Sequence, residues 1–79
     1  MKLPRDLTGR QLAAALVRTW SYRQVHRVGS HIILDTDVPS AHRIAVPDHT
    51  PLRIGTLNAI LRAVAQHKRV ERRAIIESL

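Results

Sequence analysis

A glycine–serine pair between two strand-like segments is the feature that most constrains the fold of this chain. Gly29 and Ser30 separate a segment that ends at Val28 from one that begins at His31. Because a two-residue connection that contains glycine joins neighbouring antiparallel strands, the two segments are predicted to form a hairpin. The turn also determines where His31 points, and histidine can both accept and donate a proton near neutral pH.

The residues around this turn predict three strands. Residues 20–28 are rich in aromatic and β-branched side chains, and residues 31–35 form a short apolar run. Residues 42–46 alternate polar with apolar side chains before Pro47 ends the run. Three consecutive strands form a meander. Simple alternation divides the first segment into two faces, with Arg23, Val25 and Arg27 on one and Tyr22, Gln24, His26 and Val28 on the other.

Helices are predicted on both sides of the strands. Residues 8–11, Thr-Gly-Arg-Gln, match a capping box, so a helix should begin there and continue to about Thr19. A second helix should open at Gly55 and Thr56, with Thr56 as its cap, and a short third helix is expected near the C-terminus. The apolar stripes of the three helices are Leu12, Ala15, Leu16 and Thr19 in the first, Leu57, Ile60, Leu61 and Val64 in the second, and Ile75, Ile76 and Leu79 in the third.

This order of elements predicts a single α+β domain over residues 1–79. An α-β-β-β-α chain with a short C-terminal helix packs as two layers, in which the helices cover one face of the sheet and leave the other face open. Alternation along the second strand places His31 either on the open face or under the helices. Its position beside a polar turn favours the open face.

The charge of the chain points to a polyanionic partner. The chain contains thirteen Lys and Arg residues and six Asp and Glu residues, which gives a net charge of +7. Eleven of the thirteen basic residues are arginine. Arginine suits phosphate because its planar group donates two parallel hydrogen bonds. Nucleic acid is the first candidate and an acidic protein the second, whereas solubility alone is the simpler alternative. The arginines are spread along the chain, so only folding can gather them.

Other features argue against several classes of protein. The chain has no cysteine, which favours a reducing, cytoplasmic setting. It has no apolar run long enough to span a membrane, and its first residues do not resemble a signal peptide. We expect neither a metal nor a small-molecule cofactor. A metal site made by His26, His31 and His42 is the alternative, but no carboxylate or cysteine joins these histidines at a recognisable spacing.

Together these motifs resemble the HicA family of small toxins from toxin–antitoxin modules. The shared features are an N-terminal helix, Gly29-Ser30-His31 between two strands, a third strand that runs into Pro47-Asp48-His49, and Gly55-Thr56-Leu57 at the start of the next helix. The resemblance covers nearly the whole chain. The chain departs from the family where Ser21-Tyr22 replaces a Gly-aromatic pair. A second departure is the length of the loop from Asp35 to Ala41, which is longer than usual in the family.

The resemblance implies a fold similar to the double-stranded-RNA-binding domain and an mRNA interferase activity. By position, His31 corresponds to the active-site histidine of that family. The implied partners are messenger RNA and a HicB-like antitoxin that binds and silences the toxin.

The chemistry expected at His31 also follows from RNA itself. RNA carries its own nucleophile, the 2′-hydroxyl, so a histidine that transfers protons and cations that bind phosphate can suffice for cleavage. The alternatives are a surface histidine without catalytic duty, a non-catalytic RNA-binding module, and a DNA-binding protein, although no segment resembles a helix-turn-helix. The predicted RNA contacts around His31 are Arg23, Arg27, Ser30, Arg43 and His49.

Overall fold

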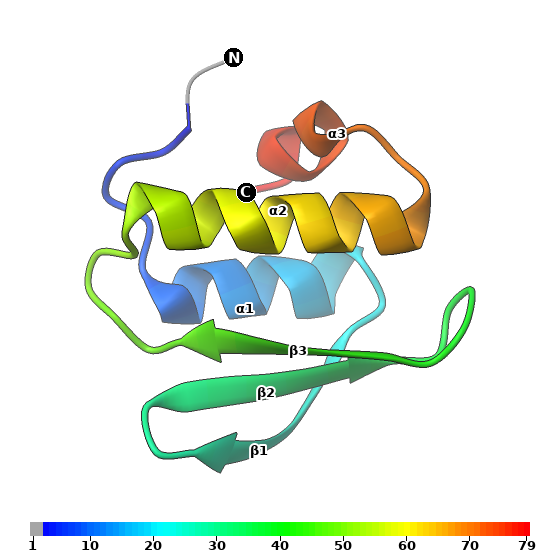
Figure 1. The fold of residues 1–79 in the computed structure, drawn as a ribbon, viewed down its shortest axis with the longest axis horizontal. Helices are drawn as coiled ribbons and strands as arrows, with labels where there is room; N and C mark the ends of the chain where they lie inside the picture. Colours follow the sequence, from blue (N-terminus) through cyan, green and yellow to red (C-terminus); the bar gives the residue numbers. More distant parts are fainter. Residues whose placement is uncertain (1–2) are drawn as a thin grey trace.

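The computed structural model describes residues 3–79 and has the predicted α+β order of elements (Figure 1). Two helices lie side by side over one face of a three-stranded sheet, and a third, short helix lies on their far side. The elements are α1 (Gly9–Thr19), β1 (Arg23–Val28), β2 (His31–Thr36), β3 (His42–Pro47), α2 (Ile54–Lys68) and α3 (Arg72–Glu77).

The sheet is an antiparallel meander in the order β1-β2-β3. Ile32 and Leu34 of β2 face the helices, and their partners on β3 are Val46 and Ile44. All four belong to the hydrophobic core. Ile33, between them, points the other way and lies outside this core cluster. The predicted division into one covered face and one open face is therefore confirmed.

The capping box that starts α1 is present. The Gln11 backbone N–H donates to Thr8 Oγ1 at 3.1 Å, and the Thr8 N–H donates to Gln11 Oε1 at 2.9 Å. Of the predicted apolar stripe, Leu12 and Leu16 are fully buried, and each such leucine stabilises the fold by about 1.5–3 kcal/mol. Thr19 was expected on the same stripe but is exposed, because it lies in the last turn of the helix.

The start of α2 differs from the prediction. The helix begins at Ile54 with Arg53 as its N-cap, and the Leu57 N–H donates to the Arg53 carbonyl at 2.9 Å. No side chain caps this end. Thr56 lies inside the first turn, so the prediction that it caps the helix is wrong. The predicted core-facing stripe of α2 is confirmed, since Leu57, Ile60, Leu61 and Val64 are all buried.

The short helix α3 belongs to the core. Ile75 and Ile76 are buried and Leu79 packs against the core, as the sequence predicted. Trp20 at the end of α1 donates through Nε1 to Ser78 Oγ at 2.8 Å, which attaches the C-terminal residues to the first helix. Among residues 3–79, no helix has the length and apolar character needed to cross a membrane.

Candidate active site

His31 is the first residue of β2 and stands directly after the hairpin turn. Gly29 has a φ of 59°, and Ser30 does not share this left-handed conformation, a pattern typical of a type II′ turn. His31 pairs with Val28 on β1 and with Pro47 on β3. It shares the face of Ile33, away from the helices, and it is exposed. The expectation that His31 lies on the open face is confirmed.

A β-bulge in β1 changes the faces predicted for that strand. Gln24 pairs with Leu34 and His26 with Ile33, so Val25 is an extra residue between two consecutive pairs. Arg23 is therefore on the open face, whereas Arg27, opposite Ile32, is on the helix face. The prediction that Arg23 and Arg27 share a face is wrong, because alternation fails across a bulge.

The same register brings His26 onto the face of His31. His26 is opposite Ile33 and Val28 is opposite His31, so the two histidines are diagonal neighbours on adjacent strands. Both are exposed. The sequence contained the signal for this relation. A two-residue turn makes Val28 the partner of His31, and His26 lies two residues before Val28.

The three arginines predicted to bind phosphate are all held by aspartates. Arg43 makes two hydrogen bonds to the Asp35 carboxylate, at 2.6 and 2.9 Å. Arg23 donates to Asp37 at 2.9 Å. The hydrogen bond from Arg43 is the main cause that lowers the pKa of Asp35 below its ordinary value, against a smaller opposing effect of desolvation. These arginine side chains are largely exposed, so a phosphate can compete for them.

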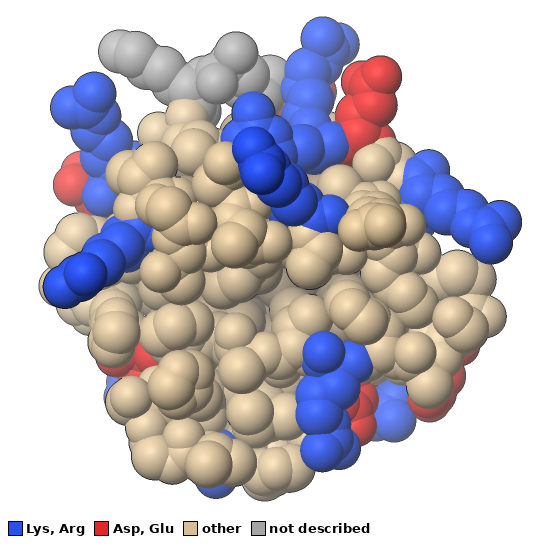
Figure 2. Space-filling view, in the orientation of Figure 1, with Lys and Arg blue, Asp and Glu red and all other residues tan. Residues whose placement is uncertain are grey.

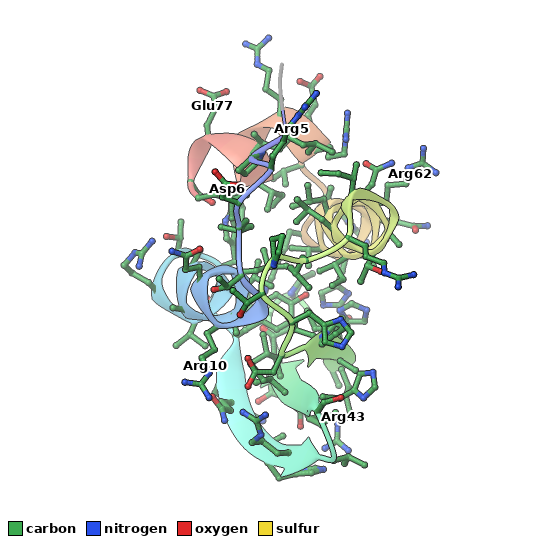
Figure 3. All side chains as sticks on the ribbon, turned by 90° about the vertical axis from the view of Figure 1, so that its left-hand side faces the viewer. Arg5, Asp6, Arg10, Arg43, Arg62 and Glu77 are labelled. Atoms are coloured by element: carbon green, nitrogen blue, oxygen red, sulfur yellow. The ribbon has the colours of Figure 1, made fainter. Side chains whose placement is uncertain are left out.

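Arg27 belongs to a separate cluster on the helix side of the sheet. Asp48 Oδ2 accepts from Arg27 at 2.8 Å and from Arg10 of α1 at 3.2 Å. The hydrogen bond from Arg27 is the main cause that lowers the pKa of Asp48. Arg10 lies on the α1 side of the sheet, whereas Arg43 lies on the opposite side (Figure 3). Arg27 is thus close to His31 in sequence but separated from it by the sheet.

Ser30 and His49 lie at the same end of the sheet as His31. Ser30 is exposed in the turn, and its carbonyl accepts from the Asp48 N–H at 2.7 Å. His49 is exposed two residues beyond Pro47, and its carbonyl accepts from the Gly9 N–H at 3.0 Å. The loop after β3 is therefore attached both to the hairpin turn and to the start of α1.

The open face is not a continuous basic surface. His31 and the Asp35 position are four residues apart on β2, about 13 Å along the strand, so Arg23 and Arg43 lie away from His31. On the face drawn in Figure 2, Lys and Arg side chains stand apart, with neutral surface between them. A groove of about 480 Å³ lies on the other side of the sheet, between α1 and β1, where Arg10, Arg18 and Arg27 contribute to its walls.

A second polar cluster occupies the far end of the sheet. His42 Nδ1 lies 3.0 Å from the Tyr22 hydroxyl, and the His42 ring stacks on His67 with centroids 4.3 Å apart. Lys68 Nζ donates to Thr36 Oγ1 at 2.9 Å and lies 4.8 Å from the centroid of the Tyr22 ring. Burial raises the pKa of Tyr22 to about 12, so its hydroxyl stays protonated.

This cluster removes the alternative of a three-histidine metal site. His42 pairs with Thr36, at the opposite end of β2 from His31, and it faces the helices. It therefore cannot join His26 and His31. Within residues 3–79, no group of three or more His, Cys, Asp or Glu side chains is arranged to hold a metal ion.

Mild acid is expected to destabilise the protein through His42. Burial, and then the charges of His67 and Lys68, lower the pKa of His42 below its ordinary value of 6.5. The unfolded chain therefore binds a proton there at a higher pH than the folded protein, so stability falls as the pH decreases below about 6.5. The melting temperature, measured between about pH 8 and pH 5, should decrease with acidity. The decrease should be smaller in His42→Asn than in His49→Asn, and equal slopes in the two variants would refute this origin.

Comparison of the chain with protein-family models, with curated proteins and with solved structures finds no match.

Proposed function

We propose that this protein is the toxin of a HicAB-like type II toxin–antitoxin module, an endoribonuclease that cleaves messenger RNA without a metal ion. The observation that supports this most is the placement of His31. A two-residue turn holds it at the hairpin end of the open face, exposed to a macromolecular substrate. The net charge of +7 favours an RNA partner, and the α-β-β-β-α order agrees with the fold that the HicA resemblance implies.

The proposed reaction uses the 2′-hydroxyl of the RNA as nucleophile. A base removes the 2′ proton, the 2′ oxygen forms a bond to phosphorus, and the bond from phosphorus to the 5′ oxygen breaks as that oxygen takes up a proton. The products are a 2′,3′-cyclic phosphate and a 5′-hydroxyl, so no water molecule or redox partner is consumed in this step. His31 takes part in proton transfer.

In this proposal Arg23 and Arg43 bind phosphates on one side of the cleavage point. Arg23 and Arg43 share the open face with His31 but are displaced along the strands, so they suit neighbouring phosphates better than the scissile one. They would exchange their aspartate partners for phosphate. Ser30 and His49 extend the contacts at the hairpin end. Arg27 lies on the helix face, so it would contact only the part of the RNA that passes around the sheet edge formed by β1.

The proposal includes an inhibitory partner. A basic toxin favours an antitoxin with acidic groups, and a HicB-like protein that covers the open face would block access to His31. RNA cleavage would then stop at saturating antitoxin.

Cleavage of purified RNA in the presence of EDTA tests the proposal. The full chain is expected to cleave RNA into products with 2′,3′-cyclic phosphate and 5′-hydroxyl ends. DNA of the same sequence should stay intact, because it lacks the 2′-hydroxyl. A 3′-hydroxyl product would contradict the chemical route. RNA that is bound but never cleaved would instead support a non-catalytic RNA-binding module, and binding should weaken steeply as salt rises in either case.

A further inference from the structure

His26 and His31 form a pair of exposed histidines on the open face. Diagonal positions on adjacent antiparallel strands have Cα atoms about 7–8 Å apart, within reach of long side chains. The positions paired with His31 or next to it on this face carry Val28, Ile33 and Pro47, which are all apolar. The imidazole of His31 therefore has apolar neighbours, whereas His26 also lies diagonal to Asp35.

Two histidine side chains at diagonal positions can both reach a phosphate that lies between them. In an in-line displacement the attacking 2′ oxygen and the departing 5′ oxygen lie on opposite sides of phosphorus. A ring that hydrogen-bonds one oxygen, at about 2.7–3.0 Å, is poorly placed to reach the other at the same time. One histidine alone therefore leaves either proton removal or leaving-group protonation without a catalyst.

We propose that His26 is a second catalytic residue, the general acid that protonates the 5′ oxygen while His31 accepts the proton of the 2′-hydroxyl. This assignment rests on the proposed ribonuclease function. The proton that His31 gains and the proton that His26 loses are exchanged with solvent when the products leave.

The charges on the open face distinguish the two roles. Asp35 follows Ile33, the partner of His26, by two residues on the same face of β2, so it is diagonal to His26. Its carboxylate is hydrogen-bonded to Arg43 of β3, and the charge of His26 is one of the smaller causes that lower the pKa of Asp35, after that hydrogen bond. His26 is therefore the histidine of the pair that lies nearer to a carboxylate, and we assign it the role of proton donor. The positions opposite and diagonal to His31 carry no acidic residue.

RNA with sulfur in place of the bridging 5′ oxygen tests the assignment. A thiolate leaves without a proton far more readily than an alkoxide does, because a thiol has a pKa of about 8.5. His26→Ala is expected to slow cleavage of ordinary RNA by about 10²- to 10³-fold. On the sulfur substrate, His26→Ala should be close to the parent protein, whereas His31→Ala should remain slow on both substrates. Equal losses of His26→Ala on the two substrates would overturn the role as proton donor.

Matched variants separate this inference from the proposed function. Gln24→Ala changes an exposed residue of the same strand that faces the helices, and it should cleave at the parental rate. His26→Gln should be as slow as His26→Ala, with a melting temperature close to that of the parent. If His26→Ala cleaves ordinary RNA normally while His31→Ala does not, only the role of His26 is refuted. If the parent protein cleaves no RNA, the proposed function itself fails.

Discussion

His31→Ala is expected to slow RNA cleavage by about 10²- to 10⁴-fold, the usual contribution of a positioned proton-transfer group. The side chain is exposed at the first position of β2, so its removal leaves no cavity in the core. Binding of RNA should weaken much less than cleavage, because the cationic side chains that we propose to contact phosphate are unchanged. The effect should therefore appear in the rate of the chemical step.

Single-turnover cleavage with saturating protein measures that rate directly. His31→Asn provides the matched control, because it keeps a polar side chain that cannot exchange a proton near neutral pH, and it should be as slow as His31→Ala. The melting temperature verifies that both variants fold. Parental cleavage rates in a folded His31→Ala protein would remove His31 from the mechanism.

Gly9→Ala is expected to destabilise the protein by about 2–4 kcal/mol, through overpacking that side-chain rotation cannot relieve. Gly9 is the first residue of α1, and its N–H donates to the His49 carbonyl. A Cβ at this position would lie 2.9 Å from the carbonyl carbon of Pro47 and closer still to its oxygen. Because these are backbone atoms, either α1 or the loop after β3 must move. Chemical denaturation with urea measures the loss.

Gly55→Ala is the matched control for this prediction. Gly55 also lies in the first turn of a helix, but a Cβ there would meet nothing within 4 Å. Alanine should be neutral or stabilising at that position, by up to about 1 kcal/mol, because glycine is a poor helix former. Similar stabilities of Gly9→Ala and Gly55→Ala would show that α1 is not packed tightly against the loop.

Most of the predictions that depended on local pattern were confirmed, although Thr56 does not cap α2 and Thr19 is exposed. The capping box at Thr8 and Gln11 starts α1, and the apolar spacing of α2 identifies its buried stripe. The turn at Gly29 pairs Val28 with His31, which places the histidine at the end of a strand. These features depend on residues a few positions apart, so their physical causes are contained in short stretches of sequence.

The other predictions that failed concern the faces of a strand and the partners of charged side chains. Alternation placed Arg23 and Arg27 together, but the bulge at Val25 separates them across the sheet, and no glycine in β1 marks the bulge. Charge predicted cations available to phosphate, yet Arg23, Arg27 and Arg43 are each paired with an aspartate from a distant or neighbouring segment. Such pairs form only when the strands are in register.

By itself, the sequence determined the order of helices and strands, the hairpin that presents His31, and the open face on which it lies, because periodicity and turn chemistry act locally. The tertiary structure alone decided that Arg23 and Arg27 lie on opposite faces of the sheet and that His42 stacks on His67 at the other end. It also decided that Gly9 is in close contact with the loop after β3. These relations depend on strand register and on contacts between segments distant in the chain, which no local pattern specifies.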